Sequence, residues 1–170
     1  TKGIEQAPYA MQTWGDGSLR FGANWGTPPG AVGIGNWNSA TKMAAGEWVH
    51  AATTYDGSTI RFYINGQKDS SEVPQTLVFG TVNQSLTLGC DFPGGDEYFN
   101  GALDDVRVYD RPLTDEQVES LYNGMPPAFV KAENPTPADG ATGIISQLLQ
   151  WEAGETAYWS VSYTHLRAHE

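Results

Sequence analysis

The sequence predicts an all-β protein with antiparallel strands. Asp-Gly at 56–57 and Asn-Gly at 65–66 supply the positive φ angles that tight two-residue hairpins need. Between these turns every second residue is large and apolar, as in a strand with one buried face: Ile60, Phe62 and Ile64. The 20 glycines and 10 prolines are also typical of a turn-rich fold. Residues 46–67 are therefore predicted to form a three-stranded meander.

Further strands and two polar loops are predicted on both sides of this meander. Gly-Asp-Gly at 15–17 is a third hairpin signal. Residues 24–45 and 91–100 are polar and rich in glycine, and long loops of this kind often carry function. The strands predicted outside the meander are residues 9–14, 18–23, 86–90 and 102–109.

A short helix is predicted to begin after Thr114. Thr114 and Gln117 form a capping box, and two acidic residues between them suit the positive end of a helix. Gly124 suits the C-terminal cap. The apolar stripe that would pack against the protein consists of Val118, Leu121 and Tyr122.

Two segments of the chain resemble one family of sandwich proteins. Residues 46–67, GEWVHAATTYDGSTIRFYINGQ, and residues 99–124, FNGALDDVRVYDRPLTDEQVESLYNG, resemble the laminin-G-like jelly-roll modules of the concanavalin-A-like lectin/glucanase superfamily. The resemblance implies an antiparallel jelly-roll β-sandwich with one short C-terminal helix over residues 1–124. It also implies opening strands that precede Lys2 and pair with the closing strand near Val106, so we expect this module to be N-terminally truncated.

Three further segments are predicted after the helix. Residues 125–133 contain two prolines and read as a linker. Residues 134–160 resemble the opening of an immunoglobulin-like or fibronectin-like module and are too short to bury a sandwich core, so a partial second β-sandwich is expected. Residues 161–170, VSYTHLRAHE, read as the translation of a transposase adapter used in sequencing libraries, and functional reasoning excludes them.

The formal net charge of −11 limits the classes of partner. Nucleic acid is not expected as a partner, because proteins that bind phosphate backbones carry a basic face. An acidic surface is compatible with calcium or simply with solubility. No apolar stretch is long enough to cross a bilayer, so no membrane insertion is predicted for this chain.

The sequence predicts no catalytic centre. Glucanases of the resembled superfamily carry Glu-x-Asp-x-Glu along one strand, and this chain has no such run. In the closing strand, Asp104 and Asp110 would lie about 20 Å apart, which is too far for a glycosidase pair. His50 is accompanied by no serine-elbow motif. The chain is therefore predicted not to be an enzyme.

Three acidic residues are candidates for calcium. Alternation places Asp104 on the same side as Val108, facing apolar groups, where a carboxylate must be paired, protonated or metal-bound. The family resemblance implies a calcium-binding role for acidic residues near this point; a buried hydrogen bond is the alternative. Asp91 and Asp96 form a second oxygen-rich group, for which an ordinary polar loop is the alternative.

Ligand contact would involve aromatic rings near the loops, because sugars stack their apolar faces on such rings. The candidates by loop position are Trp25, Trp37, Tyr98 and Phe99. Each ring could equally anchor a loop or belong to the core.

The leading hypothesis is a noncatalytic carbohydrate- or protein-binding module of a secreted or surface-anchored bacterial multidomain protein. Its partner would be a glycan or an extracellular protein, and the resemblance implies an extracellular or cell-surface location. One alternative is a structural spacer or adhesion module without a small ligand. The other is an accessory module of a carbohydrate-active enzyme whose catalytic domain lies outside this sequence.

Overall fold

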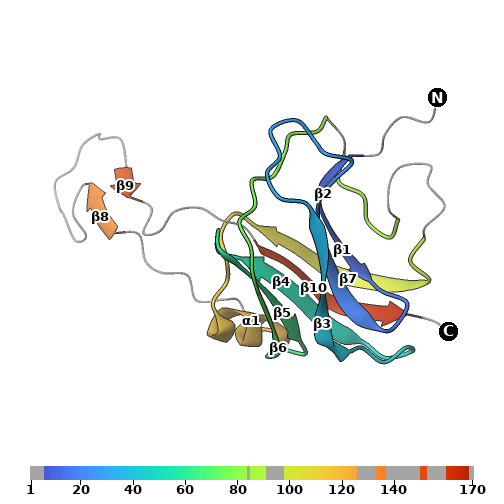
Figure 1. Cartoon of the computed structure of the whole chain (residues 1–170). Coiled ribbons are helices and arrows are strands. Elements are labelled where there is room, and N and C mark those ends of the chain that lie inside the picture. Colours follow the sequence, from blue (N-terminus) through green and yellow to red (C-terminus); the bar gives the residue numbers. More distant parts are fainter. Residues whose placement is uncertain are drawn as a thin grey trace.

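The computed structural model describes residues 6–83, 85–90, 98–125, 133–136, 150–152 and 160–168 (Figure 1). Its strands pair antiparallel throughout. One sheet has the order β1-β2-β3, with bounds Ala7–Thr13, Ser18–Trp25 and Gly35–Lys42. A second has the order β6-β5-β4-β10-β7, with bounds Gln67–Pro74, Thr59–Ile64, Val49–Tyr55, Ser160–Ala168 and Gly101–Tyr109. A separate two-stranded sheet joins β8 and β9, Glu133–Thr136 and Gln150–Glu152.

The inner faces of the two larger sheets share one hydrophobic core. Leu19 and Phe21 on β2 belong to the same buried cluster as Ile60 and Phe62 on β5, and none of these four side chains is more than 2% exposed. Burial of such side chains contributes roughly 1.5–3 kcal/mol each to folding. The antiparallel β-sandwich predicted from the sequence is confirmed.

The outer face of the five-stranded sheet is covered by the helix α1, Asp115–Tyr122 (Figure 1). The predicted capping box is present: the Thr114 side chain accepts from the Gln117 N–H, and the Gln117 side chain accepts from the Thr114 N–H. Val118 and Leu121 then pack against Tyr63 of β5. Within the described ranges, no helix has the length and apolarity needed to cross a membrane.

Two predicted elements differ from the structure. Residues 35–42 were expected to be loop, but they form β3. Although the sequence GNWNSATK is polar, it alternates so that Trp37 and Ser39 face inward. Residues 86–90 were expected to be a strand, yet they contribute only an isolated bridge between Cys90 and Tyr98. Leu86 and Leu88 are more than half exposed, so their apolar character does not reflect burial in a sheet.

The strand β10 lies between β4 and β7 in the five-stranded sheet (Figure 1). It runs antiparallel to both neighbours, so that Tyr163 is opposite Ala51 on one side and Val106 on the other. The family resemblance predicted that a strand from before Lys2 would pair here. In this structure, residues 160–168 hold the position beside the closing strand β7.

Candidate binding face of the three-stranded sheet

The four aromatic residues predicted to bind a ligand lie in different environments. Trp37 points inward, stacks on Phe21 with ring centroids 6.4 Å apart, and packs against the core. Phe99 is also packed against the core, whereas Tyr98 is 69% exposed. This packing favours the structural alternative for Trp37 and Phe99. Of the other two predicted rings, Tyr98 is exposed and Trp25 is partly exposed.

Trp25 lies on the outer face of the three-stranded sheet because of the residue before it. Asn24 has a φ of 57°, which interrupts the strand alternation and turns Trp25 to the side opposite Phe21. The indole ring covers Gly22, where an added Cβ would come within 2.9 Å of the ring. Its Nε1 donates a 2.8 Å hydrogen bond to Asn36 Oδ1. The position of the Trp25 ring is thus fixed by packing against Gly22 and by the hydrogen bond to Asn36.

The side chain of Asn24 holds this end of the sheet together. Its Nδ2 donates to the carbonyl oxygens of Val32, Gly33 and Val78, at 3.2, 2.6 and 2.9 Å. Its Oδ1 accepts the N–H of Gly80 at 3.0 Å. Because Asn24 is fully buried, these bonds are shielded from water and tie two loops to the end of β2.

A second ring was not predicted to take part. Trp14, in the turn between β1 and β2, is 48% exposed, and the guanidinium carbon of Arg20 lies 3.1 Å from its ring centroid. In such a cation–π contact the positive charge is attracted to the electron-rich face of the ring. The Nε of Arg20 donates to Asn38 Oδ1 at 2.9 Å, which fixes the plane of the guanidinium. The signal in the sequence was the alternation of β2, which places Arg20 outward between inward Leu19 and Phe21.

These residues form one continuous feature, here named the outer-face strip. The strand register aligns Arg20 with Asn38 and Gly22 with Asn36 on neighbouring strands. Two tryptophans at the ends of β2, a guanidinium and two amides therefore lie on one side of the sheet. The outer-face strip consists of Trp14, Arg20, Trp25, Asn36 and Asn38.

The calcium candidates do not assemble into a site among the described residues. Asp104 is exposed, not turned toward apolar groups as alternation predicted, and its Oδ1 accepts the N–H of Asp105 at 2.8 Å. The reason is local: Asp105 has a φ of 51°, which breaks the alternation of β7. No group of three His, Cys, Asp or Glu side chains in the described residues could hold a metal ion. Asp91 and Asp96 lie outside the described residues.

Comparison with known proteins identifies the family. Residues 2–119 match the family model of laminin-G type described as the concanavalin A-like lectin/glucanases superfamily. The chain belongs to this family. The match ends before residues 134–160, so an immunoglobulin-like or fibronectin-like module there stays a prediction.

Two proteins are similar to this laminin-G-like module. An adhesion G-protein coupled receptor V1 of Danio rerio is 28% identical over 87 residues, which are 50% of this chain and 1% of the receptor. A solved S-layer domain-containing protein of Clostridium thermocellum, residues 221–444, is 22% identical, with 72% of this chain and 65% of that structure covered at a TM-score of 0.36. The chain thus spans a small part of the receptor and about two thirds of the solved domain.

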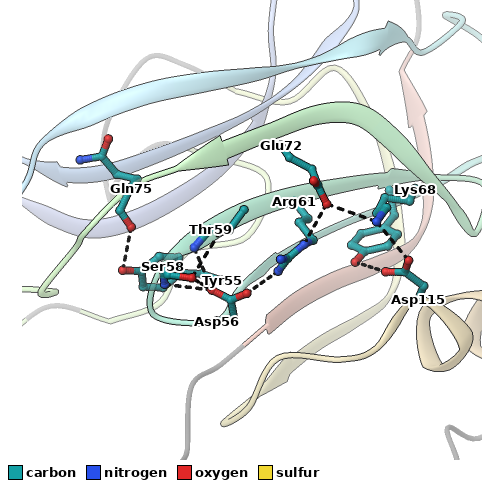
Figure 2. Close-up of polar contacts among 10 residues, drawn as sticks. Tyr55, Asp56, Ser58, Thr59, Arg61, Lys68, Glu72, Gln75 and Asp115 are labelled. Carbon is teal, nitrogen blue, oxygen red and sulfur yellow. Dashed lines mark hydrogen bonds and ion pairs between the residues drawn. The ribbon is translucent and has the colours of Figure 1, made fainter.

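Five charged side chains among the described residues of the laminin-G-like module are paired with one another (Figure 2). Arg61 bonds to Asp56 and to Glu72, and Lys68 joins Glu72 to Asp115 of α1. Partial burial raises the pKa of Asp56, but hydrogen bonds from Arg61 and its own turn outweigh burial and hold that pKa well below its usual range. These contacts join β5, β6 and α1, so the group supports the fold.

His50 of the laminin-G-like module is a structural residue. It is 2% exposed, its backbone N–H donates to Asn65 Oδ1 at 3.0 Å, and its ring packs 5.9 Å from that of Tyr122. Burial and ring packing favour a structural role for His50.

Proposed function

We propose that this laminin-G-like chain is a noncatalytic glycan-binding module of a secreted or surface-anchored multidomain protein. The observation that supports the proposal is the outer-face strip, in which the Trp25 ring lies against Gly22 and is held by a hydrogen bond to Asn36. Membership of a family described by lectins and glucanases, and similarity to a receptor named for adhesion, support a binding role outside the cell.

The chemistry of the outer-face strip suits a sugar chain. The C–H faces of pyranose rings stack on exposed indoles, and such contacts add about 0.5–1.5 kcal/mol beyond the area buried. A few convergent polar groups then give orientation. Asn36 is exposed beside the Trp25 ring, and Asn38 lies in the adjacent row of the sheet. Both amides retain donor hydrogens for sugar hydroxyls while their oxygens hold Trp25 and Arg20 in place.

The test is a glycan array probed with the whole chain, followed by titration of the best ligand with two matched variants. Trp25→Ala should weaken binding about tenfold, because it removes the stacking surface. Tyr98→Ala removes a more exposed ring that is not part of the outer-face strip and should leave affinity unchanged. If Tyr98→Ala abolishes binding and Trp25→Ala does not, the outer-face strip is not the site.

A second variant tests the position of the ring without removing it. In Gly22→Ala the new methyl group would meet Asn36 Oδ1 at 2.8 Å and the Trp25 ring at 2.9 Å. We expect the ring to be displaced and the affinity to fall, with a melting temperature close to that of the unmodified chain because the site is on the outer face. Absence of any glycan binding would overturn the proposal and favour the spacer hypothesis.

A further inference from the structure

The charges of this chain are distributed unequally between its two sheets. The whole sequence has a net charge of −11, yet residues 6–46, which contain the three-stranded sheet, include one acidic residue, Asp16, and two basic ones, Arg20 and Lys42. The strands β1, β2 and β3 contain no Asp or Glu at all. An anion that binds to the three-stranded sheet would therefore meet no carboxylate from its strands.

Of the two basic residues, Lys42 is already neutralised. Its Nζ lies 2.5 Å from Asp16 Oδ2, and this hydrogen bond, with those from Ser18, holds the pKa of Asp16 well below its usual range. Arg20 has no such partner: in the part of the chain that the structure describes, it forms no ion pair, and its hydrogen bond to Asn38 engages only Nε. The Arg20 guanidinium is thus available to bind an anion.

Arg20 is also held in position before any ligand arrives. Trp14 supports one face of the guanidinium at 3.1 Å, and Asn38 fixes its Nε edge. The two terminal nitrogens donate no hydrogen bond to the described residues, and they form the fork that matches a carboxylate or sulfate. A guanidinium that is already ordered loses less side-chain entropy on binding than a mobile one.

We propose that the outer-face strip recognises an anionic glycan, with the terminal nitrogens of Arg20 on a carboxylate or sulfate group and the Trp25 ring under a neighbouring sugar. Arg20 and Gly22, which carries the Trp25 ring, are two residues apart on β2, about 7 Å along the strand. The cation and the stacking ring thus lie side by side along β2, so that two neighbouring sugars of one glycan chain could contact them. This inference rests on the proposed glycan-binding function.

The experiment compares three polymers of similar length: a polyuronate, a sulfated glucan and the unsulfated glucan. The whole chain should bind at least one of the two anionic polymers about tenfold more tightly than the neutral one, because the neutral polymer makes no hydrogen bond between charged groups with Arg20. Arg20→Gln should remove that preference. Arg20→Lys keeps the charge but loses the planar fork, so it should restore only part of the preference.

Lys42→Gln is the matched control, because it removes the same charge from the same sheet but from a lysine that is already paired. It should leave the preference intact. Comparison of the polyuronate with the sulfated glucan identifies the anionic group that the fork accepts.

Three outcomes would overturn the inference. Equal affinity for neutral and anionic polymers, with sensitivity to Trp25→Ala, would reject the anionic preference while the glycan-binding function stands. Equal losses from Arg20→Gln and Lys42→Gln, both abolished by moderate salt, would show general electrostatic attraction in place of a site. Failure to bind any polymer, in this experiment and on the array, would reject both the inference and the proposed function.

Discussion

At the scale of single residues, Asn24 has two separate effects on the candidate site. Its positive φ directs Trp25 to the outer face, and its side chain bonds to four backbone groups of two loops. Asparagine is one of the few residues that adopt this backbone region readily. The same residue therefore determines both where the ring points and how firmly the ends of the sheet are held.

Asn24→Asp is expected to destabilise the protein strongly. The substitution preserves the shape but replaces the buried Nδ2 donor with a second acceptor, which would face three carbonyl oxygens. We expect a loss of about 3 kcal/mol in the free energy of unfolding, measured by denaturant titration. Asn83→Asp, at an exposed position, is the control and should change stability little. A similar small change in both variants would contradict the role of the Asn24 network.

At the scale of elements, Asp69 connects the two sheets. It lies on β6, is 5% exposed, and accepts the backbone N–H groups of Ala40 and Thr41 on β3 at 2.9 and 2.8 Å. It also accepts the N–H of Ser71 at 2.8 Å. Partial burial raises the pKa of Asp69, but hydrogen bonds from the Thr41 side chain and from these backbone N–H groups outweigh burial and lower the pKa to about 2. A carboxylate thus takes the place of a strand partner where the edge of β3 meets β6.

Asp69→Asn should therefore reduce stability in a pH-dependent manner. The pKa of an unfolded aspartate is about 3.9. Since the folded pKa is lower, the stabilisation is complete above about pH 4 and is lost as the pH falls toward 2. At pH 7 we expect the variant to lose about 2 kcal/mol in the free energy of unfolding, and the difference between the two proteins should shrink below pH 4. Melting temperatures from pH 2 to 7 would check this; a constant difference across that range would contradict it.

At the scale of the whole molecule, β10 completes the five-stranded sheet. Without it, β4 and β7 would each present unpaired backbone groups in the middle of the sheet. Removal of residues 160–170 is therefore expected to abolish cooperative thermal unfolding and to promote aggregation. Removal of residues 169–170 alone is the control and should have little effect. A truncated chain that unfolds cooperatively at the original midpoint would show that β10 is not needed.

Local signals predicted much of this fold. The turns at 56–57 and 65–66, the first two strands of the meander and the capped helix each depend on neighbouring residues, and each is found where the sequence indicated. The third strand of the meander, β6, extends to Pro74, beyond the predicted residues 46–67. The strand β3 was missed because its inward alternation is carried by Trp37 and Ser39 among glycine and asparagine, which have low strand propensity.

The candidate site was predicted less well because it depends on contacts between strands. Trp25 and Trp37 look equivalent in the sequence, and only the backbone angle of Asn24 separates the surface ring from the core ring. Trp14 and Arg20 meet across a hairpin whose register no short motif reveals. The interpretation of residues 161–170 as adapter sequence stays a prediction, which recovery of the same codons from an independent, adapter-free library would contradict.

The central position of β10 also affects how this chain can fold. Its partners, Val49–Tyr55 and Gly101–Tyr109, are separated from it by about one hundred and about fifty residues, so both pairings close long loops. Folding slows as contacts become less local. The strand is also the last to be synthesised among the described elements. In a growing chain, β4 and β7 therefore keep these edges unpaired until residues 160–168 have been synthesised, and association with other chains is favoured during this interval.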